Sequence, residues 1–179
     1  YVAAMLSLVP NLVTMDLAAP VHFALSYDEE AGGRGAPHMI ARIPDFCALP
    51  IGCIVGEPSG LAPVLRHKGK TAIRLTATGK PGHSSRTDLG LNAIHMLRPA
   101  IDAVVDVTEA LKTGPLDPAF EPPWSTMQIG IIRGGEAINI IPEHACMDIE
   151  ARAIAGVSPD DLLQPIIDQA TAVGLSSEK

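Results

Sequence analysis

Aromatic side chains are scarce in this 179-residue sequence, at 3% of residues, and acidic residues outnumber basic ones, which gives a formal net charge of -7. With so few rings, the chain has no platform on which nucleobases could stack. An acidic chain is also not expected to bind nucleic acid or an anionic membrane. No apolar run reaches the ~18 residues that a membrane span requires. We therefore expect neither nucleic acid nor a membrane as a partner.

Cysteine is equally rare. Cys47, Cys53 and Cys146 are widely spaced and form no Cys-x-x-Cys pair. This pattern predicts no disulfide framework and favours a reducing compartment, the cytoplasm. Their apolar neighbours predict that all three are small core residues. The sequence begins at Tyr1 within an apolar pattern. We therefore expect it to be part of a longer protein, and the lack of a targeting signal is uninformative.

Hydrophobic residues make up 47% of the sequence and charged residues 18%, so a globular chain is expected. In the first part, two apolar helices, residues 2–17 and 34–43, are predicted to alternate with two apolar strands, residues 21–27 and 51–55. The first helix is expected to be kinked or broken at Pro10, and the second to end at Pro44. The order helix, strand, helix, strand predicts an α/β portion with a parallel-type sheet over residues 1–68.

Carboxylates follow both predicted strands. Asp28, Glu29 and Glu30 come directly after the first strand, and Glu57 follows the second. In open α/β sheets, ligands bind beyond the carboxyl ends of the strands. The matching positions of Glu30 and Glu57 therefore predict a ligand site. The alternative is that these acids are solvated turn residues or helix caps.

The pattern changes after residue 68. Strands with one apolar face are predicted at residues 73–77, 127–131 and 147–151. Helices with one apolar stripe are predicted at residues 94–104 and 159–173. Thr87 and Asp88 are predicted to cap the first of these helices, and Ser158 the second. The order β-α-β-β-α predicts an α+β ferredoxin-like domain over residues 69–179 that lacks its last strand.

Four stretches of the chain, taken in order, resemble the M20 family of dinuclear zinc hydrolases: residues 26–30, 55–59, 82–85 and 134–142. The resemblance implies a zinc-binding α/β catalytic domain with an inserted ferredoxin-like lid, and a homodimer formed through that lid. Within the family, His67-Lys68-Gly69-Lys70 and the serine pair after His83 look most like members that act on N-acetyl-L-ornithine.

The same resemblance implies roles for the acids of the first part. Glu30 and Glu57 match metal ligands, one for each of two Zn²⁺ ions per active site, with Co²⁺ as a possible substitute. Glu29 matches the general base that takes a proton from a water. The family's His-x-Asp motif and late histidine are missing from this sequence. Since zinc prefers three or four protein ligands, the chain by itself is expected to be inactive.

Three residues of the second part are implied to act on the substrate. His83 matches the lid histidine that reaches into the partner subunit's site and stabilises the tetrahedral oxyanion. Asn139 and Arg152 match residues that bind the substrate α-carboxylate, a task suited to a guanidinium fork. The alternatives are an exposed loop histidine, a turn asparagine and an arginine that forms a surface ion pair with Glu150.

The reaction implied for the intact protein is zinc-dependent hydrolysis of an N-acyl amino acid, with N-acetyl-L-ornithine converted to L-ornithine and acetate in arginine biosynthesis. Succinyl-diaminopimelate desuccinylase, aminoacylase and dipeptidase activities remain open within the family. A truncated, inactive dimerisation module is the alternative outside enzymology. A nucleotide-binding domain is disfavoured because no GxGxxG or GxxxxGK motif is present.

Overall fold

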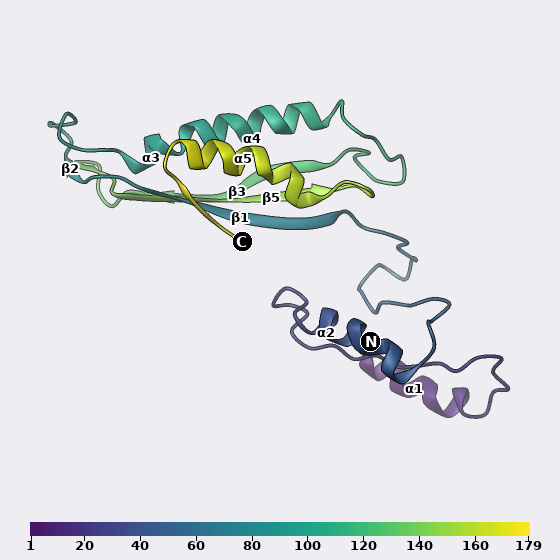
Figure 1. Cartoon of the computed structure of the whole chain (residues 1–179). Helices are drawn as coiled ribbons and strands as arrows, with labels where there is room; N and C mark the ends of the chain where they lie inside the picture. The colour runs from purple at the N-terminus through teal and green to yellow at the C-terminus, as the bar shows by residue number, and fades with distance from the viewer. The chain divides into compact units, whose positions relative to one another are not determined.

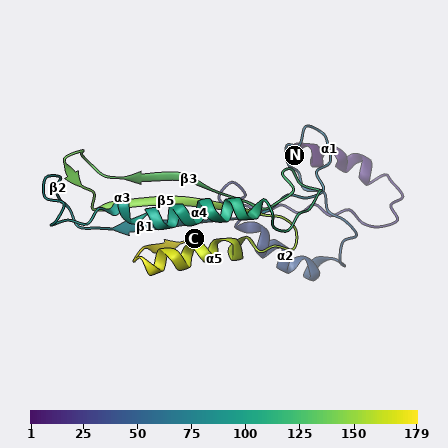
Figure 2. The same cartoon turned by 90° about the horizontal axis from the view of Figure 1, so that it is seen from above.

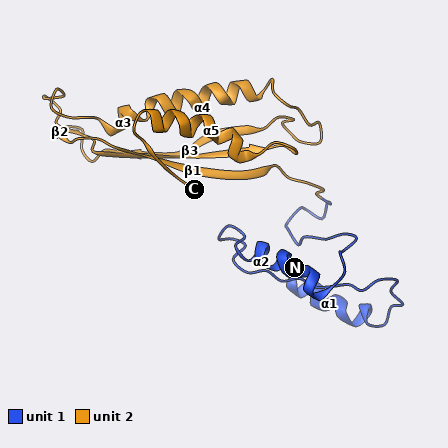
Figure 3. Ribbon diagram, in the orientation of Figure 1, with its two compact units in different colours: residues 1–63 blue, residues 64–179 orange.

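The computed structural model describes residues 1–179. The chain divides into two compact units, residues 1–63 and 64–179 (Figure 3). The sequence predicts a division after Lys68, and the units divide after Pro63. The catalytic role predicted for the first part and the lid role predicted for the second remain predictions.

Unit 1 contains two helices, α1 (Val2–Leu12) and α2 (Gly35–Phe46), each with a proline inside it. The first helix is not broken at Pro10, and the prediction that the second ends at Pro44 is wrong. The backbone ladder continues past both, since Val13 N donates to Val9 O and Cys47 N donates to Ile43 O. A proline in the last turns removes a single helical hydrogen bond, and the rest of the helix is kept.

The strands predicted at residues 21–27 and 51–55 are not formed, because unit 1 contains no β-strand. A strand needs a neighbour to accept and donate its backbone hydrogen bonds, and these two segments do not pair. Their large apolar side chains are exposed, and Gly35 is the only buried residue of the unit. Cys53 is exposed as well, so its predicted place in a core is wrong.

Unit 2 is built on a four-stranded sheet with the order β3-β5-β1-β6, in which every neighbouring pair is antiparallel (Figures 1 and 2). The strands are β1 (Gly69–Thr78), β3 (Thr126–Gly134), β5 (His144–Ala153) and β6 (Ser176–Glu178). Two long helices, α4 (Arg98–Leu111) and α5 (Pro159–Ala172), cover one face of this sheet (Figure 1). This is the order of a βαββαβ ferredoxin-like unit.

The prediction that the last strand is missing is wrong. β6 pairs with β1 through Ser176, Ser177 and Glu178. It carries no apolar alternation, so the sequence gives no strand signal there. The buried Leu175 places the chain end against the core, and the sheet edge then supplies the hydrogen-bonding partner.

The core lies between the sheet and the two helices. Alternate residues of β5 point towards the helices, namely Ala145, Met147, Ile149 and Ala151. They pack with fully buried residues of the helical layer, which include Leu97, Leu163 and Ile166. The apolar residues whose alternation predicted β5 are therefore the ones that the structure buries.

Short elements form a tip at one end of the sheet. β2 (Gly82–His83) and β4 (Ile140–Ile141) make a two-stranded ladder, and α3 (Ala93–Met96) follows β2. The predicted caps Thr87 and Asp88 are wrong, because α3 begins after Asn92. The Asn92 Oδ1 atom accepts from Ile94 N at 2.9 Å and from His95 N at 3.2 Å.

The edge strand β3 carries an irregularity. Its register with β5 shifts between Ile129, which lies opposite Ile149, and Ile131, which lies opposite Asp148. Past this bulge, Ile131 is 41% exposed and Ile132 is 52% exposed. The outer edge of β3 is therefore unpaired and apolar at this end.

None of the helices described above has the length and apolar character that a membrane-spanning helix requires.

Candidate functional site

The tip ladder brings two of the predicted site residues together. His83 lies opposite Ile140 in the β2–β4 pair, and Ser84 N donates to Asn139 O at 3.0 Å. His83 and Asn139 therefore occupy adjacent backbone segments, although they are far apart in the sequence. The His83 side chain is exposed to solvent.

The imidazole of His83 is held by the residue two positions later. Ser85 N lies 3.2 Å from the His83 Nδ1 atom and donates to it, and Ser85 Oγ lies 2.8 Å from the same atom. Because a backbone N–H can only donate, Nδ1 is the acceptor and carries no proton. In the neutral ring the proton then resides on Nε2, which makes no hydrogen bond within the chain. The ring thus presents a free N–H donor to its surroundings.

An arginine fork stiffens the loop that follows. Arg86 donates from Nε to Asp88 Oδ1 at 2.9 Å and from Nη2 to Asp88 Oδ2 at 2.8 Å. This hydrogen bonding holds the pKa of Asp88 below its usual range and raises that of Arg86. Arg86 N also donates to His83 O at 2.9 Å, which closes a turn around the histidine.

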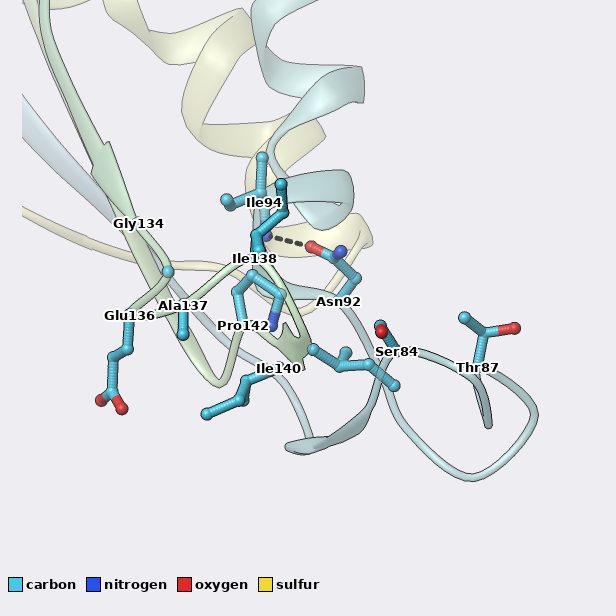
Figure 4. Close-up of a pocket in the computed structure, with 12 residues that line it drawn as sticks. Ser84, Thr87, Asn92, Ile94, Gly134, Glu136, Ala137, Ile138, Ile140 and Pro142 are labelled. Carbon is cyan, nitrogen blue, oxygen red and sulfur yellow. Dashed lines mark hydrogen bonds between the residues drawn. The ribbon is translucent and has the colours of Figure 1, made fainter.

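An open hollow of about 500 Å³ lies beside the ladder (Figure 4). Its polar lining residues are Ser84, Thr87, Asn92 and Glu136. Its apolar lining residues are Ile94, Ala137, Ile138, Ile140, Ile141 and Pro142. The Asn92 amide oxygen is already occupied by the start of α3, as the dashed line in Figure 4 shows. Ser84 and Thr87 of the loop that follows His83 line the hollow, whereas His83 itself does not.

Arg152 lies near the other end of β5. It is eight residues from His144, at the tip end of β5, which is about 26 Å along a strand that rises ~3.3 Å per residue. The structure therefore does not bring Arg152 to His83 and Asn139 within one chain. Its Nε atom lies 2.5 Å from Glu150 Oε1, so the predicted alternative of an ion pair with Glu150 is observed. Lys70 Nζ approaches the same oxygen at 3.8 Å.

The predicted acids of unit 1 are exposed. Glu29 and Glu30 lie in a turn that leads to α2, where Gly33 N donates to Asp28 O at 2.9 Å and Asp28 has φ +54°. Glu57 lies in an irregular segment. No three His, Cys, Asp or Glu residues of the chain come together in a group that could hold a metal ion. As arranged here, Glu30 and Glu57 do not fit a complete zinc site, which needs at least three ligands.

The sequence did not predict the contact of Ser85 with the His83 ring or the hollow beside the ladder. The signal for Ser85 was present, since a serine two residues after a histidine in a turn can reach the ring. The hollow carries no local signal, because its lining comes from three segments that meet only in the fold.

Residues 65–178 match the family described as the M20 peptidase dimerisation domain. Acetylornithine deacetylase from Photorhabdus laumondii is 34% identical over 149 residues, which cover 82% of this chain and 37% of that protein. Acetylornithine deacetylase from Vibrio vulnificus is 36% identical over 143 residues, which cover 80% of this chain and 37% of that protein. The chain thus spans little more than a third of the length of these curated relatives.

Among solved structures, an amidase of the hydantoinase/carbamoylase family from Burkholderia multivorans superposes with a TM-score of 0.50 and 15% identity, over 63% of this chain and 26% of that chain. The corresponding amidase from Burkholderia vietnamiensis gives a TM-score of 0.50 at 14% identity, over 63% of this chain and 26% of that chain. At this level of identity, the likeness concerns the fold alone.

Proposed function

Because this chain belongs to the M20 peptidase family through its dimerisation domain, we propose that the whole protein hydrolyses the amide bond of an N-acyl amino acid. N-acetyl-L-ornithine is the proposed substrate, with L-ornithine and acetate as products, as a step of arginine biosynthesis. Relatives that are 34–36% identical and named acetylornithine deacetylase support this choice.

One geometric observation carries the proposal. In the His83 ring, Nδ1 accepts hydrogen bonds from Ser85, and Nε2 makes no hydrogen bond within the chain. A neutral Nε2–H is the donor that an oxyanion requires as negative charge develops on the carbonyl oxygen. Asn139, on the neighbouring segment, adds an amide whose role is to hold the substrate carboxylate in place.

The separation of His83 from Arg152 supports a site shared between two subunits. Arg152 lies opposite Lys70, near the start of β1, whereas His83 lies in the β2–β4 ladder that follows the other end of β1. We propose that Arg152 binds the substrate carboxylate in one active site while His83 serves the active site of the partner subunit. This arrangement requires a homodimer.

The edge of β3 is the proposed dimer contact. β3 has a neighbour on one side only, and Ile131 and Ile132 are exposed on it. An unpaired, apolar edge strand is a template for pairing with a second copy of itself. A two-fold axis would make such a contact self-complementary.

The acids of unit 1 complete the proposal. Glu29 takes a proton from the attacking water and gives it to the leaving amine, so that acetate and the free amino acid are released. Glu30 and Glu57 would each supply one ligand to a Zn²⁺ ion, and the remaining ligands would come from other residues of the whole protein. A zinc pair, when bound, would acidify water and polarise the amide carbonyl. The three free cysteines accord with a cytoplasmic setting.

The proposal is tested on the whole protein with a panel of N-acetyl-L-ornithine, N-succinyl-diaminopimelate, other N-acetyl amino acids and dipeptides. We expect Glu29→Ala to keep its bound metal and to lose about 10²- to 10⁴-fold in kcat, the usual contribution of a general base. Asp28→Ala is the matched control in the same turn, and it should retain hydrolysis. If the wild type hydrolyses no member of the panel, the proposed function is wrong.

A second candidate is an interaction module without catalytic activity, formed by unit 2. The specific observation in its favour is that this chain contains no group of three or more His, Cys, Asp or Glu residues that could hold a metal ion. The same panel separates the candidates: a dimer that binds no metal and hydrolyses nothing would be such a module.

A further inference from the structure

We propose that Ser85 is a positioning residue that fixes the His83 ring as the Nε2–H tautomer and sets its direction. The inference rests on two contacts to one ring nitrogen, from Ser85 N at 3.2 Å and from Ser85 Oγ at 2.8 Å. The backbone contact establishes that Nδ1 is an acceptor. The hydroxyl must then donate its own proton to the same lone pair, as a three-centre hydrogen bond.

The hydroxyl is the closer of the two donors, and it comes from a side chain that can follow the ring. The His83 side chain is exposed and contacts no other polar group through its ring. Without Ser85 Oγ, only the longer backbone contact would oppose rotation of the ring and exchange of its proton between the two nitrogens. Which nitrogen carries the proton is set by the hydrogen bond at the other nitrogen.

The preceding serine does not share this role. Ser84 donates through its backbone N to Asn139 O at 3.0 Å and lines the hollow, and the hydrogen bonds of the His83 ring come from Ser85 alone. The two adjacent serines therefore differ in function: one joins β2 to the segment before β4, and the other holds the histidine. This difference supplies a matched pair of variants.

The structural part of the inference is tested on the 179-residue chain by ¹⁵N NMR of the histidine ring nitrogens, at a pH where the ring is neutral. We expect the wild type to show an unprotonated Nδ1 and a protonated Nε2 at His83. Ser85→Ala should shift a measurable fraction of the ring to the other tautomer, and Ser85→Thr should restore the original one. Ser84→Ala should leave the tautomer unchanged, and an unaltered amide spectrum outside the loop would show that each variant folds.

Two results would overturn the inference. One is a wild-type ring that carries its proton on Nδ1. The other is a tautomer that is the same in Ser85→Ala and in the wild type, which would mean that the backbone N–H suffices.

The catalytic part rests on the proposed function and is measured separately in the whole protein. We expect Ser85→Ala to lower kcat about tenfold with little change in KM, less than the ~10²- to 10³-fold loss that follows removal of an oxyanion donor. Ser85→Thr should recover most of the rate. A tautomer shift in a protein without hydrolase activity would refute the proposed function and leave the positioning role intact. Hydrolysis that is unaffected by Ser85→Ala despite a tautomer shift would refute the catalytic part alone.

Discussion

Charged side chains on the uncovered face of the unit 2 sheet meet in pairs across neighbouring strands. Arg74 of β1 lies opposite Asp148 of β5 and donates to both of its carboxylate oxygens, at 2.6 Å and 2.8 Å. These hydrogen bonds from Arg74 hold the pKa of Asp148 below its ordinary value and raise that of the guanidinium. Two-point contacts of this kind fix the relative direction of both side chains.

The Arg74–Asp148 pair makes the unfolding free energy of unit 2 depend on pH in the acid range. A carboxyl group whose pKa is lowered in the folded state contributes stability above its ordinary pKa of 3.8, and that contribution is lost as the pH falls below this value. We expect Asp148→Asn to remove the contribution, so that the difference in unfolding free energy between variant and wild type shrinks as the pH falls from neutral to below 3.8.

Urea unfolding of both proteins across this pH range checks the prediction. Asp106→Asn, at an exposed position of α4 without a salt bridge, is the control, and its difference from the wild type should not show this pH trend. A difference for Asp148→Asn that is constant with pH would contradict the prediction.

At the scale of single residues, the sequence identified candidates but not how they are held. The resemblance singled out His83 and Asn139, and the fold brings them together at the tip. It also singled out Arg152, but spacing in the sequence could not tell that this side chain lies at the opposite end of β5. The Ser85 contact depends on the turn geometry around His83, which composition does not report.

Among the elements, the loop between β1 and α3 carries His83 and depends on one close backbone approach. Lys80 and Leu91 exchange two backbone hydrogen bonds, at 2.8 Å and 2.9 Å, at the base of the loop. A Cβ atom added to Gly79 would lie 2.0 Å from the Leu91 carbonyl oxygen. A side chain at this position therefore cannot be accommodated unless the Lys80–Leu91 pair separates.

We expect Gly79→Ala to destabilise unit 2 by about 1–3 kcal/mol, as overpacking usually does. It should also broaden or shift the ring signals of His83, because the base of its loop would open. Thermal unfolding and NMR of the variant check both effects. Gly114→Ala is the matched control, since its added Cβ would meet its nearest neighbour, Leu111 O, at an ordinary 3.5 Å. Equal stability of the two variants would contradict this account.

Elements of unit 2 could be predicted because their sequence pattern and their packing agree. β1 and β5 alternate apolar with polar residues, and the apolar set is the one buried under α4 and α5, whereas in β3 only Met127 is buried. In unit 1 the apolar segments carry the same signal, yet no neighbouring strand is present to pair with them. A strand is a property of two segments, so the pattern of one segment could not decide the matter.

For the whole molecule, the edge of β3 determines the proposed state of assembly. We expect the wild-type chain to sediment as a dimer, and the double variant Ile131→Glu, Ile132→Glu to sediment as a monomer with an unchanged circular dichroism spectrum. Like charges brought face to face across a two-fold contact oppose pairing. Gln169→Glu adds charge on exposed α5, away from this edge, and should remain dimeric. A monomeric wild type, or a dimeric double variant, would exclude this contact.

The bulge in β3 also bears on how the length of this domain can change. Gly130 is the residue that β5 leaves without an opposite partner, since Ile129 faces Ile149 and Ile131 faces Asp148. Deleting Gly130 would keep every remaining pair of the β3–β5 ladder, whereas a one-residue slip in an ordinary strand turns its apolar set to the wrong face. No heavy atom lies within 4 Å of a Cβ added there, so a larger residue also fits. β3 can therefore gain or lose one residue at position 130 during evolution while the same side chains remain in the core.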